Sequence, residues 1–298
     1  KEELLDYESF VSYIKNSISK NMGKGYDVGI NKVIHDNFPE TDILTVLKEG
    51  RNIAPNIYLN AYYESYLAGT SMTEIIKRLI MIYKHCSIPA IYDNLNYSLD
   101  VIKSHIFFRI INFKRNMKIL NQIPYIRFWD MAVTFHCLVR SYDDSVSIIR
   151  ITNEHLRRWG ITVDELHRLA YDNTRKLFPP SLRTIDEILN EYLCNDSKYD
   201  ESKDSCHLYI LSNEKGVYGA FYILYKDIIR DFARLINSNL YILPSSIHEI
   251  ILVPVKDSPG KEYLSRLVSE INESMISDEE ILSDNVYIYY VEKDEITG

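Results

Sequence analysis

The sequence predicts an α+β protein in which antiparallel sheets are built from repeated strand-turn-strand-helix units, with helices packed on the sheet face. Short apolar runs come in pairs separated by a few turn residues, and a segment with helical spacing follows each pair. Strands this close along the chain must be antiparallel, because a parallel return needs a crossover of roughly a dozen residues. The chain of 298 residues, 46% of them hydrophobic, is long enough to fill a sizeable core.

The N-terminal part predicts one helix, a three-stranded meander and two further helices. Apolar residues recur at helical spacing from Phe10 to Ile18, and Gly23 ends this run. Ser71 and Glu74 have the spacing of a capping box at the start of another helix. The expected elements are a helix over 7–22, strands over 26–34, 41–48 and 56–59, and helices over 61–67 and 71–86.

The rest of the chain predicts three strand-turn-strand-helix units, preceded by a short helix, a strand and another helix. These first elements are expected over 98–103, 106–113 and 116–120. The strand pairs are expected over 131–140 and 145–151, 207–211 and 219–224, and 240–243 and 249–255, with a last strand over 286–291. The helices that follow the pairs are expected over 154–159 and 163–177, 226–236, and 260–273.

A domain boundary is expected near Pro124, which gives an N-terminal α+β region over 1–124 and a C-terminal α+β domain over 125–298. The polar stretch 195–205 is the clearest loop, because Tyr199 is its one apolar residue. The strand pairs on the two sides of this loop look alike. We therefore expect them to extend one sheet within the C-terminal domain.

Composition favours a soluble cytoplasmic protein without a membrane partner. No run approaches the roughly 20 apolar residues that cross a bilayer, and the start of the sequence lacks the basic end and apolar run of a signal peptide. Tyrosine is abundant, at 24 residues, which fits broad contact surfaces as well as core packing. The cysteines are Cys86, Cys137, Cys194 and Cys206, and no two of them have the spacing of metal ligands. Neither a metal site nor a cofactor is therefore expected.

Charge is unevenly distributed along this chain, whose net charge is −8. Residues 184–298 hold 22 acidic and 10 basic side chains, whereas the basic island over 103–127 holds six basic and no acidic ones, interleaved with aromatic residues. Stacking and phosphate contacts hold single-stranded nucleic acids, so Arg109, Lys114 and Arg115 are candidate ligand-binding residues. Alternatively, the aromatic residues belong to the core, and the basic side chains face water or pair with the acidic C-terminal part.

The segment Leu240–Pro254 holds adjacent serine, histidine and carboxylate residues at a Pro-Ser-Ser turn between two apolar runs. Ser246, His248 and Glu249 are therefore candidate catalytic residues, with the serine as nucleophile and the histidine as its base. Strand alternation would place His248 and Glu249 on opposite faces, and the turn has no GxSxG elbow. The favoured interpretation is turn chemistry, in which the serines bond the turn backbone and His248 bonds a neighbouring carbonyl.

Several segments resemble a bacterial domain family of unknown function that is common in anaerobic gut bacteria. The resemblance spans most of the chain beyond about residue 100 and rests on residues 116–139, 151–169, 209–225, 240–254 and 282–290. Its most specific part is YILPSSIHE over 241–249. The resemblance implies a bacterial, cytoplasmic protein and carries no catalytic residue over to this chain. Residues 1–95 are interpreted from their pattern alone.

The leading hypothesis for function is a non-catalytic interaction or regulatory module that binds a protein partner. Abundant tyrosine and the strand pairs expected at the surface support it. One alternative is a small hydrolase or transferase that uses Ser246 and His248. The other is nucleic-acid binding through the basic island, which the net charge of −8 opposes unless the positive field is confined to one patch.

Overall fold

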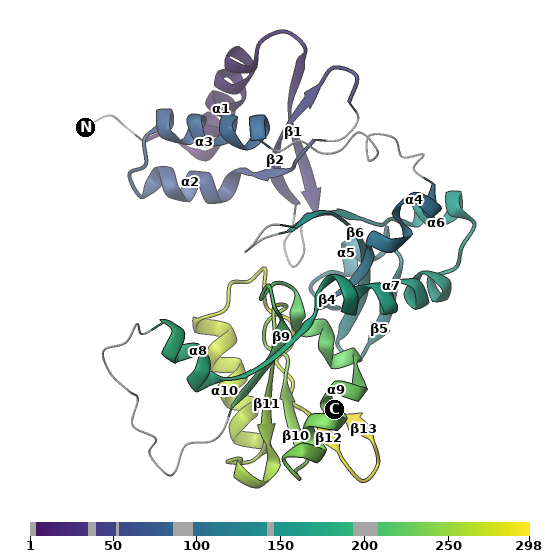
Figure 1. Cartoon of the computed structure of the whole chain (residues 1–298). Helices are drawn as coiled ribbons and strands as arrows, with labels where there is room; N and C mark the ends of the chain where they lie inside the picture. Colours follow the sequence, from purple (N-terminus) through teal and green to yellow (C-terminus); the bar gives the residue numbers. More distant parts are fainter. Residues whose placement is uncertain (1–3, 35–39, 52–53, 86–97, 142–145, 193–207) are drawn as a thin grey trace. The chain divides into compact units, whose positions relative to one another are not determined.

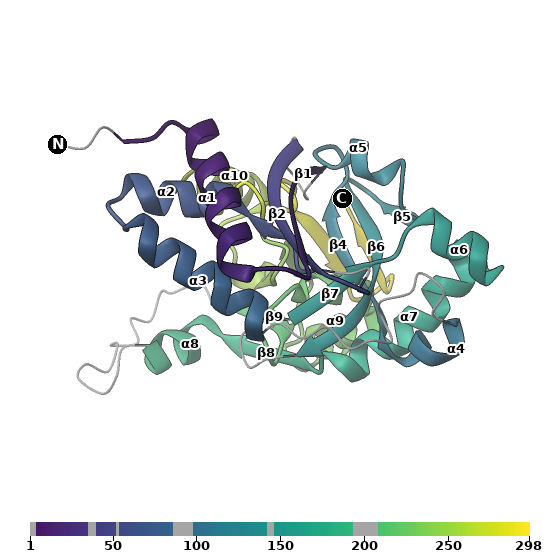
Figure 2. The same cartoon turned by 90° about the horizontal axis from the view of Figure 1, so that it is seen from above.

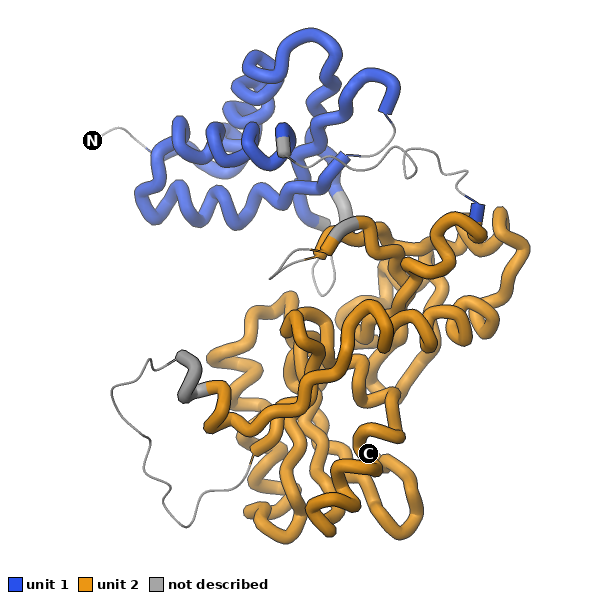
Figure 3. The backbone as a smooth tube through the Cα atoms, in the orientation of Figure 1, with its two compact units in different colours: residues 1–98 blue, residues 99–298 orange. Residues whose placement is uncertain are grey.

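The computed structural model describes residues 4–34, 40–51, 54–85, 98–141, 146–192 and 208–298. The chain divides into two compact units, Lys1–Ser98 and Leu99–Gly298 (Figure 3). Each unit has its own sheets and helices. Among the described residues, no helix has the length and apolar character that crossing a membrane requires.

The first unit is a three-stranded antiparallel sheet with helices packed on one face (Figure 1). Its elements are α1 (Tyr7–Met22), β1 (Tyr26–Ile34), β2 (Glu40–Lys48), β3 (Ile57–Tyr58), α2 (Leu59–Leu67) and α3 (Met72–His85). Helix α1 begins where the Asp6 side chain accepts a hydrogen bond from Ser9 N–H at 2.8 Å, and it ends at Gly23. Val28 and Leu44 share a core with Phe10 of α1, and the elements predicted for this unit are confirmed with small shifts at their ends.

The second unit holds two antiparallel sheets. In the first, β4, β6 and β5 lie in that order and β7 also pairs with β6; the second has the order β13-β12-β10-β11-β9-β8. The strands of the first sheet are β4 (Ile106–Asn112), β5 (Tyr125–Phe128), β6 (Met131–Ser141) and β7 (Val146–Arg150). Those of the second are β8 (Pro180–Thr184), β9 (Tyr209–Asn213), β10 (Leu240–Leu243), β11 (Ile250–Pro254), β12 (Tyr287–Tyr290) and β13 (Glu295–Thr297). The predicted α+β class with antiparallel sheets is confirmed.

Helices cover the sheets of this unit. They are α4 (Leu99–Ile102), η2 (Lys103–His105), α5 (Met117–Leu120), α6 (Asn153–Trp159), α7 (Val163–Leu177), α8 (Ile185–Tyr192), η3 (Gly219–Leu224), α9 (Lys226–Leu235), η4 (Val255–Asp257) and α10 (Lys261–Ser274). Helix α7 lies against β4 (Figures 1 and 2). Helix α10 packs on the face of the second sheet that carries Leu243 and Val253, whereas Phe232 of α9 contacts Tyr209 on the opposite face. Helices therefore cover both faces of the second sheet.

One predicted strand is wrong, because residues 219–224 form the 3₁₀ helix η3. Gly219 approaches β9 so closely that an added Cβ would lie 2.2 Å from Ser212 Oγ, and this segment packs against β9 without pairing with it. Strand β9 pairs with β8 and β11. Sequence patterns also missed β5, β8, β13 and α8. Strands β5 and β6 are joined by a two-residue turn in which Trp129 adopts a φ of +54°, without the glycine or asparagine that marks such turns.

The chain divides into the two compact units between Ser98 and Leu99, whereas the sequence predicts a domain boundary near Pro124. The difference arises because β4 pairs along its whole length with β6, from Ile106 opposite Cys137 to Asn112 opposite Met131. This pairing joins residues 106–112 to the second unit. The similar strand pairs also belong to different sheets, since β6 and β7 lie in the first sheet and β10 and β11 in the second. The polar stretch 195–205 lies outside the described residues.

The two sheets of the second unit are joined by the side chain of Asp130. Its Oδ2 accepts hydrogen bonds from Ser283 Oγ at 2.6 Å and from Asn285 Nδ2 at 2.9 Å, and its Oδ1 accepts one from the Tyr287 hydroxyl. Trp129 stacks on the ring of Tyr287, with the ring centroids 4.4 Å apart. Burial and the hydrogen bond to Asp130 raise the pKa of Tyr287, so its hydroxyl stays a donor at neutral pH.

Asp130→Ala is expected to lower the free energy of unfolding of the second unit by about 2–4 kcal/mol, because three donors lose their acceptor together. Both tryptophans, Trp129 and Trp159, lie in this unit, so urea unfolding followed by tryptophan fluorescence reports on it. Asp100→Ala is the matched control, since Asp100 is 84% exposed and forms a surface ion pair with Lys103. Equal losses of unfolding free energy in Asp130→Ala and Asp100→Ala would contradict the role of Asp130 in joining the two sheets.

Candidate functional site

In the Pro-Ser-Ser turn between β10 and β11, the hydroxyl group of Ser246 and the ring of His248 bond different partners. Ser246 is 3% exposed, and its Oγ accepts a hydrogen bond from the backbone N–H of His248 at 3.0 Å. The His248 ring accepts a hydrogen bond at Nδ1 from Tyr218 N–H at 3.2 Å, which places the ring proton on Nε2. This Nε2 donates to Glu280 Oε1 at 3.3 Å. Both ring nitrogens therefore have partners other than Ser246.

Glu249 does not provide the carboxylate that contacts the histidine. That carboxylate belongs to Glu280, which lies on another segment. Glu249 precedes β11. Burial raises the pKa of its carboxyl group, and the charge of His248 and a hydrogen bond with the Ser246 side chain partly offset this rise. The expected bond from His248 to a carbonyl is wrong, because the ring bonds a backbone N–H and a carboxylate, while the expected bond of Ser246 to the turn backbone is present.

Arg109 completes a column of four side chains, which we call the Arg109 column: Arg109, Tyr218, His248 and Glu280. Arg109 is 5% exposed, and its Cζ lies 3.5 Å from the centre of the Tyr218 ring. The rings of Tyr218 and His248 stack with their centroids 5.7 Å apart and their planes 16° apart. Tyr218 adopts a φ of +59°, which is costly for a bulky residue, and the stack helps to offset this cost. The column brings together two candidates that are far apart in sequence.

Residues 278–282 run beside the turn and pair with it. Ile247 N–H donates to Glu280 O at 2.9 Å, and Leu282 N–H donates to Ser245 O at 2.8 Å, on either side of a β-bridge between Ser246 and Ile281. From the first sheet, Asn112 Nδ2 donates to Leu282 O at 2.9 Å. The turn and the first sheet therefore fix this segment from two sides.

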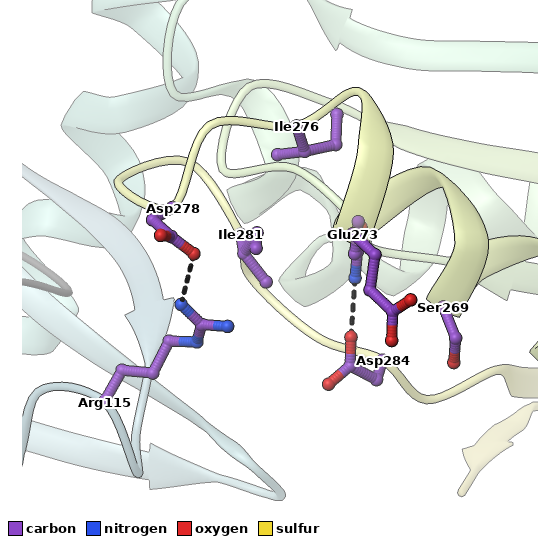
Figure 4. Close-up of a pocket in the computed structure, with 8 residues that line it drawn as sticks. Arg115, Ser269, Glu273, Ile276, Asp278, Ile281 and Asp284 are labelled. Atoms are coloured by element: carbon purple, nitrogen blue, oxygen red, sulfur yellow. Dashed lines mark hydrogen bonds and ion pairs between the residues drawn. The ribbon is translucent and has the colours of Figure 1, made fainter.

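A hollow of about 480 Å³ lies between this segment and α10 (Figure 4). Its size is within the range of roughly 300–1,000 Å³ that is usual for ligand sites. Arg115 and Asp278 point toward each other on one side and form an ion pair at 3.2 Å. Glu273 of α10 lies on the other side, and Asp284 belongs to the residues between 282 and β12. The lining is rich in charge and includes two isoleucine side chains.

The structure separates the three candidate residues of the basic island. Arg109 is buried beneath Tyr218, whereas Lys114 is exposed. Arg115 pairs with Asp278 of the acidic C-terminal part, as the alternative interpretation of the island predicted. The first two are therefore not parts of one exposed basic surface.

Sequence patterns missed Tyr218 and Glu280, which complete the Arg109 column, and they missed the hollow. Tyr218 lay within a segment that the pattern assigned to a tight turn, and Glu280 belongs to an acidic run that is typical of a solvated surface. The residues of the hollow come from parts of the chain that are far apart, so no local motif marks them.

In the part of the chain that the structure describes, no group of three or more histidine, cysteine, aspartate or glutamate side chains could hold a metal ion. Cys137 is buried, and its Sγ donates to Leu138 O at 3.9 Å. Cys86, Cys194 and Cys206 lie outside the described residues.

The fold and the site define an α+β protein of two compact units, the second of which carries a polar turn locked against a neighbouring segment. A family described as "Family of unknown function (DUF5688)" matches residues 7–290. The chain belongs to this family. The match also includes most of the first unit, whereas the resemblance noted from the sequence covers the chain beyond about residue 100. No curated protein and no solved structure matches the chain.

His136 lies near Arg109 on the same face of the first sheet, because Arg109 pairs with Thr134 and Phe107 pairs with His136. It is 1% exposed; Nε2 is 3.1 Å from Thr134 Oγ1, and Nδ1 has no hydrogen-bond partner among the described residues. Burial and the positive charges of Arg109 and Arg150 lower the pKa of His136 well below 6.5.

Stability is expected to fall as the pH is lowered from about 7 to about 5, because His136 takes up a proton in the unfolded chain and not in the folded one. The loss begins near the unfolded pKa of 6.5 and amounts to about 1.4 kcal/mol per pH unit for this group. His136→Gln should lower the slope of the unfolding free energy against pH by the contribution of one proton. His105→Gln, at an exposed position, should leave this slope unchanged. Urea unfolding at several pH values measures the slope, and an unchanged slope in His136→Gln would contradict the assignment.

Proposed function

We propose that the protein is a non-catalytic interaction module of the bacterial cytoplasm that binds a partner protein beside the Pro-Ser-Ser turn. One observation carries the proposal: Ser246 and His248 use their polar atoms to hold the turn and the residues around it. A serine activated by His248 would need a nitrogen of the His248 ring bonded to its hydroxyl. The turn instead positions the segment that borders the hollow, which favours binding. Composition and the resemblance to a bacterial family support the location.

The surface next to the hollow suits a protein partner. Met275, just after α10, is 78% exposed, and the neighbouring Ile276 lines the hollow. Exposed methionine is enriched in protein interfaces, where its flexible side chain adapts to the partner. Charged groups around an apolar centre are the usual arrangement of such interfaces. Met275 and the hollow together therefore form the surface that we assign to the partner.

The two alternatives fit the geometry less well. A hydrolase or transferase requires a ring nitrogen of His248 within reach of Ser246 Oγ, whereas both nitrogens bond other groups. Nucleic-acid binding requires a continuous basic surface, whereas Arg109 is buried and Arg115 is paired with Asp278.

The tagged protein is expected to retain a partner protein in stoichiometric amount from a lysate of its source organism. Met275→Asp should weaken the complex, rebuilt from purified components, by about tenfold or more, because a charge at the centre of an interface is buried without a partner. Leu235→Asp is the matched control, since Leu235 is 81% exposed but lies on α9. Failure to retain any stoichiometric partner, or equal weakening by both variants, would contradict the proposal.

A further inference from the structure

Strand β5 forms one edge of the first sheet of the second unit. It has four residues, and among the described strands it pairs with β6 alone, with Phe128 opposite Met131 beside the two-residue turn. In such a hairpin Phe128 and Ile126 direct their backbone groups to β6, whereas Arg127 and Tyr125 direct theirs outward. No described residue bonds these outward N–H and C=O groups.

The side chain of Arg127 leaves this edge open. Edge strands often carry charged side chains that keep other strands away. Arg127 instead turns across the sheet: its Cζ lies 4.2 Å from the centre of the Phe113 ring, beyond β6, and its Nε donates to Trp129 O at 3.0 Å. The small Ala132 of β6 permits this path, because it pairs with Arg127 on one side and with Ile111 on the other. The guanidinium is therefore held over the face of the sheet, beside an edge that another strand can reach.

We infer that β5 binds an extended segment of another protein as an added antiparallel strand, in which acidic and apolar residues alternate. In this mode of recognition, hydrogen bonds between main chains supply affinity and alternate side chains supply specificity. Tyr125 and Arg127 do not line the hollow beside α10. The edge would therefore bind its segment whether or not the surface around Met275 binds a partner.

The acidic positions of the segment follow from Arg127. Residues of an added strand that lie opposite Tyr125 and Arg127 point to the same face as these side chains, with Cβ atoms about 5 Å apart. The terminal nitrogens of Arg127 make no hydrogen bond with any described residue, so they can donate to a carboxylate. Lys114 and Lys118 are exposed nearby in the sequence, within the basic island that has no acidic residue. This positive charge accelerates the encounter with an acidic segment.

The apolar positions follow from Ile126 and Phe128. Both side chains are half-buried and point to the other face of the sheet, because they alternate with Tyr125 and Arg127. Apolar residues opposite them would extend this partly covered face. A second copy of the chain suits the edge less well, since it would bring its own Arg127 into the same short pairing, where like charges repel.

Nuclear magnetic resonance titration of the protein with the capped peptide acetyl-Glu-Val-Glu-Val-Glu-amide tests this assignment. The backbone N–H signals of Tyr125 and Arg127 should shift and exchange more slowly with solvent, because these groups gain acceptors. Those of Ile126 and Phe128 already bond β6 and should keep their exchange rates. The counterpart acetyl-Lys-Val-Lys-Val-Lys-amide should bind about tenfold more weakly or not at all, because it meets Arg127 with like charge.

Methylated peptides test the pairing without any change in the protein. In an antiparallel pair, the glutamate N–H groups of the peptide would face β5 and the valine N–H groups would face away. Methylation of the glutamate nitrogens should therefore weaken binding about tenfold or more, whereas methylation of the valine nitrogens should leave it nearly unchanged.

A charge reversal tests the acidic specificity. Arg127→Glu should weaken binding of the glutamate peptide about tenfold, because a repulsion replaces an attraction at the edge. Lys176→Glu, the same change at an exposed position on α7, should leave binding unchanged. The backbone signals of β6 show whether each variant is folded.

Unmoved signals of Tyr125 and Arg127 would overturn the assignment, as would equal binding of the lysine peptide. Equal weakening by Arg127→Glu and Lys176→Glu, or loss of binding on valine methylation, would do the same. Tighter binding of an oligothymidylate at the same signals would overturn it in favour of single-stranded nucleic acid. A dimer of the free protein that Arg127→Glu dissociates would overturn it in favour of a second copy.

Discussion

The second unit depends on the hydrogen bonds that hold residues 278–287 between its two sheets. Backbone groups of Glu280 and Leu282 pair with the Pro-Ser-Ser turn, and Asn112 of the first sheet donates to Leu282 O. Asp130 then accepts from three side chains of the residues that follow, up to the start of β12. Since each sheet contributes to this set, loss of one member weakens the contact between the sheets.

The same constraint divides the polar side chains of the region into two groups. Ser246, His248 and Asp130 have their hydrogen bonds within the fold, so they stabilise it. Glu273 lines the hollow, and the Oδ1 atom of Asn272 is buried beside it; neither has a hydrogen-bond partner among the described residues.

Local sequence patterns predicted much of the fold. Helix α1 follows from its apolar spacing, the start of α3 from the spacing of Ser71 and Glu74, and the pairing of β10 with β11 from the short turn between two apolar runs. The 3₁₀ helix η3 differs from the predicted strand, and the close approach of Gly219 to Ser212 at its start is a tertiary contact that no local pattern marks.

The site was predictable only as a turn. The bonding of His248 depends on Tyr218 and Glu280, each at least 30 residues away in sequence. The hollow likewise joins Arg115 to a segment that lies 163 residues later.

Amide hydrogen exchange tests the central constraint most directly. Ile247 and Leu282 N–H groups should exchange slowly and at a common rate, because each donates across the same bridge and both are released together. Exchange of either amide at the rate of an open loop would contradict the account.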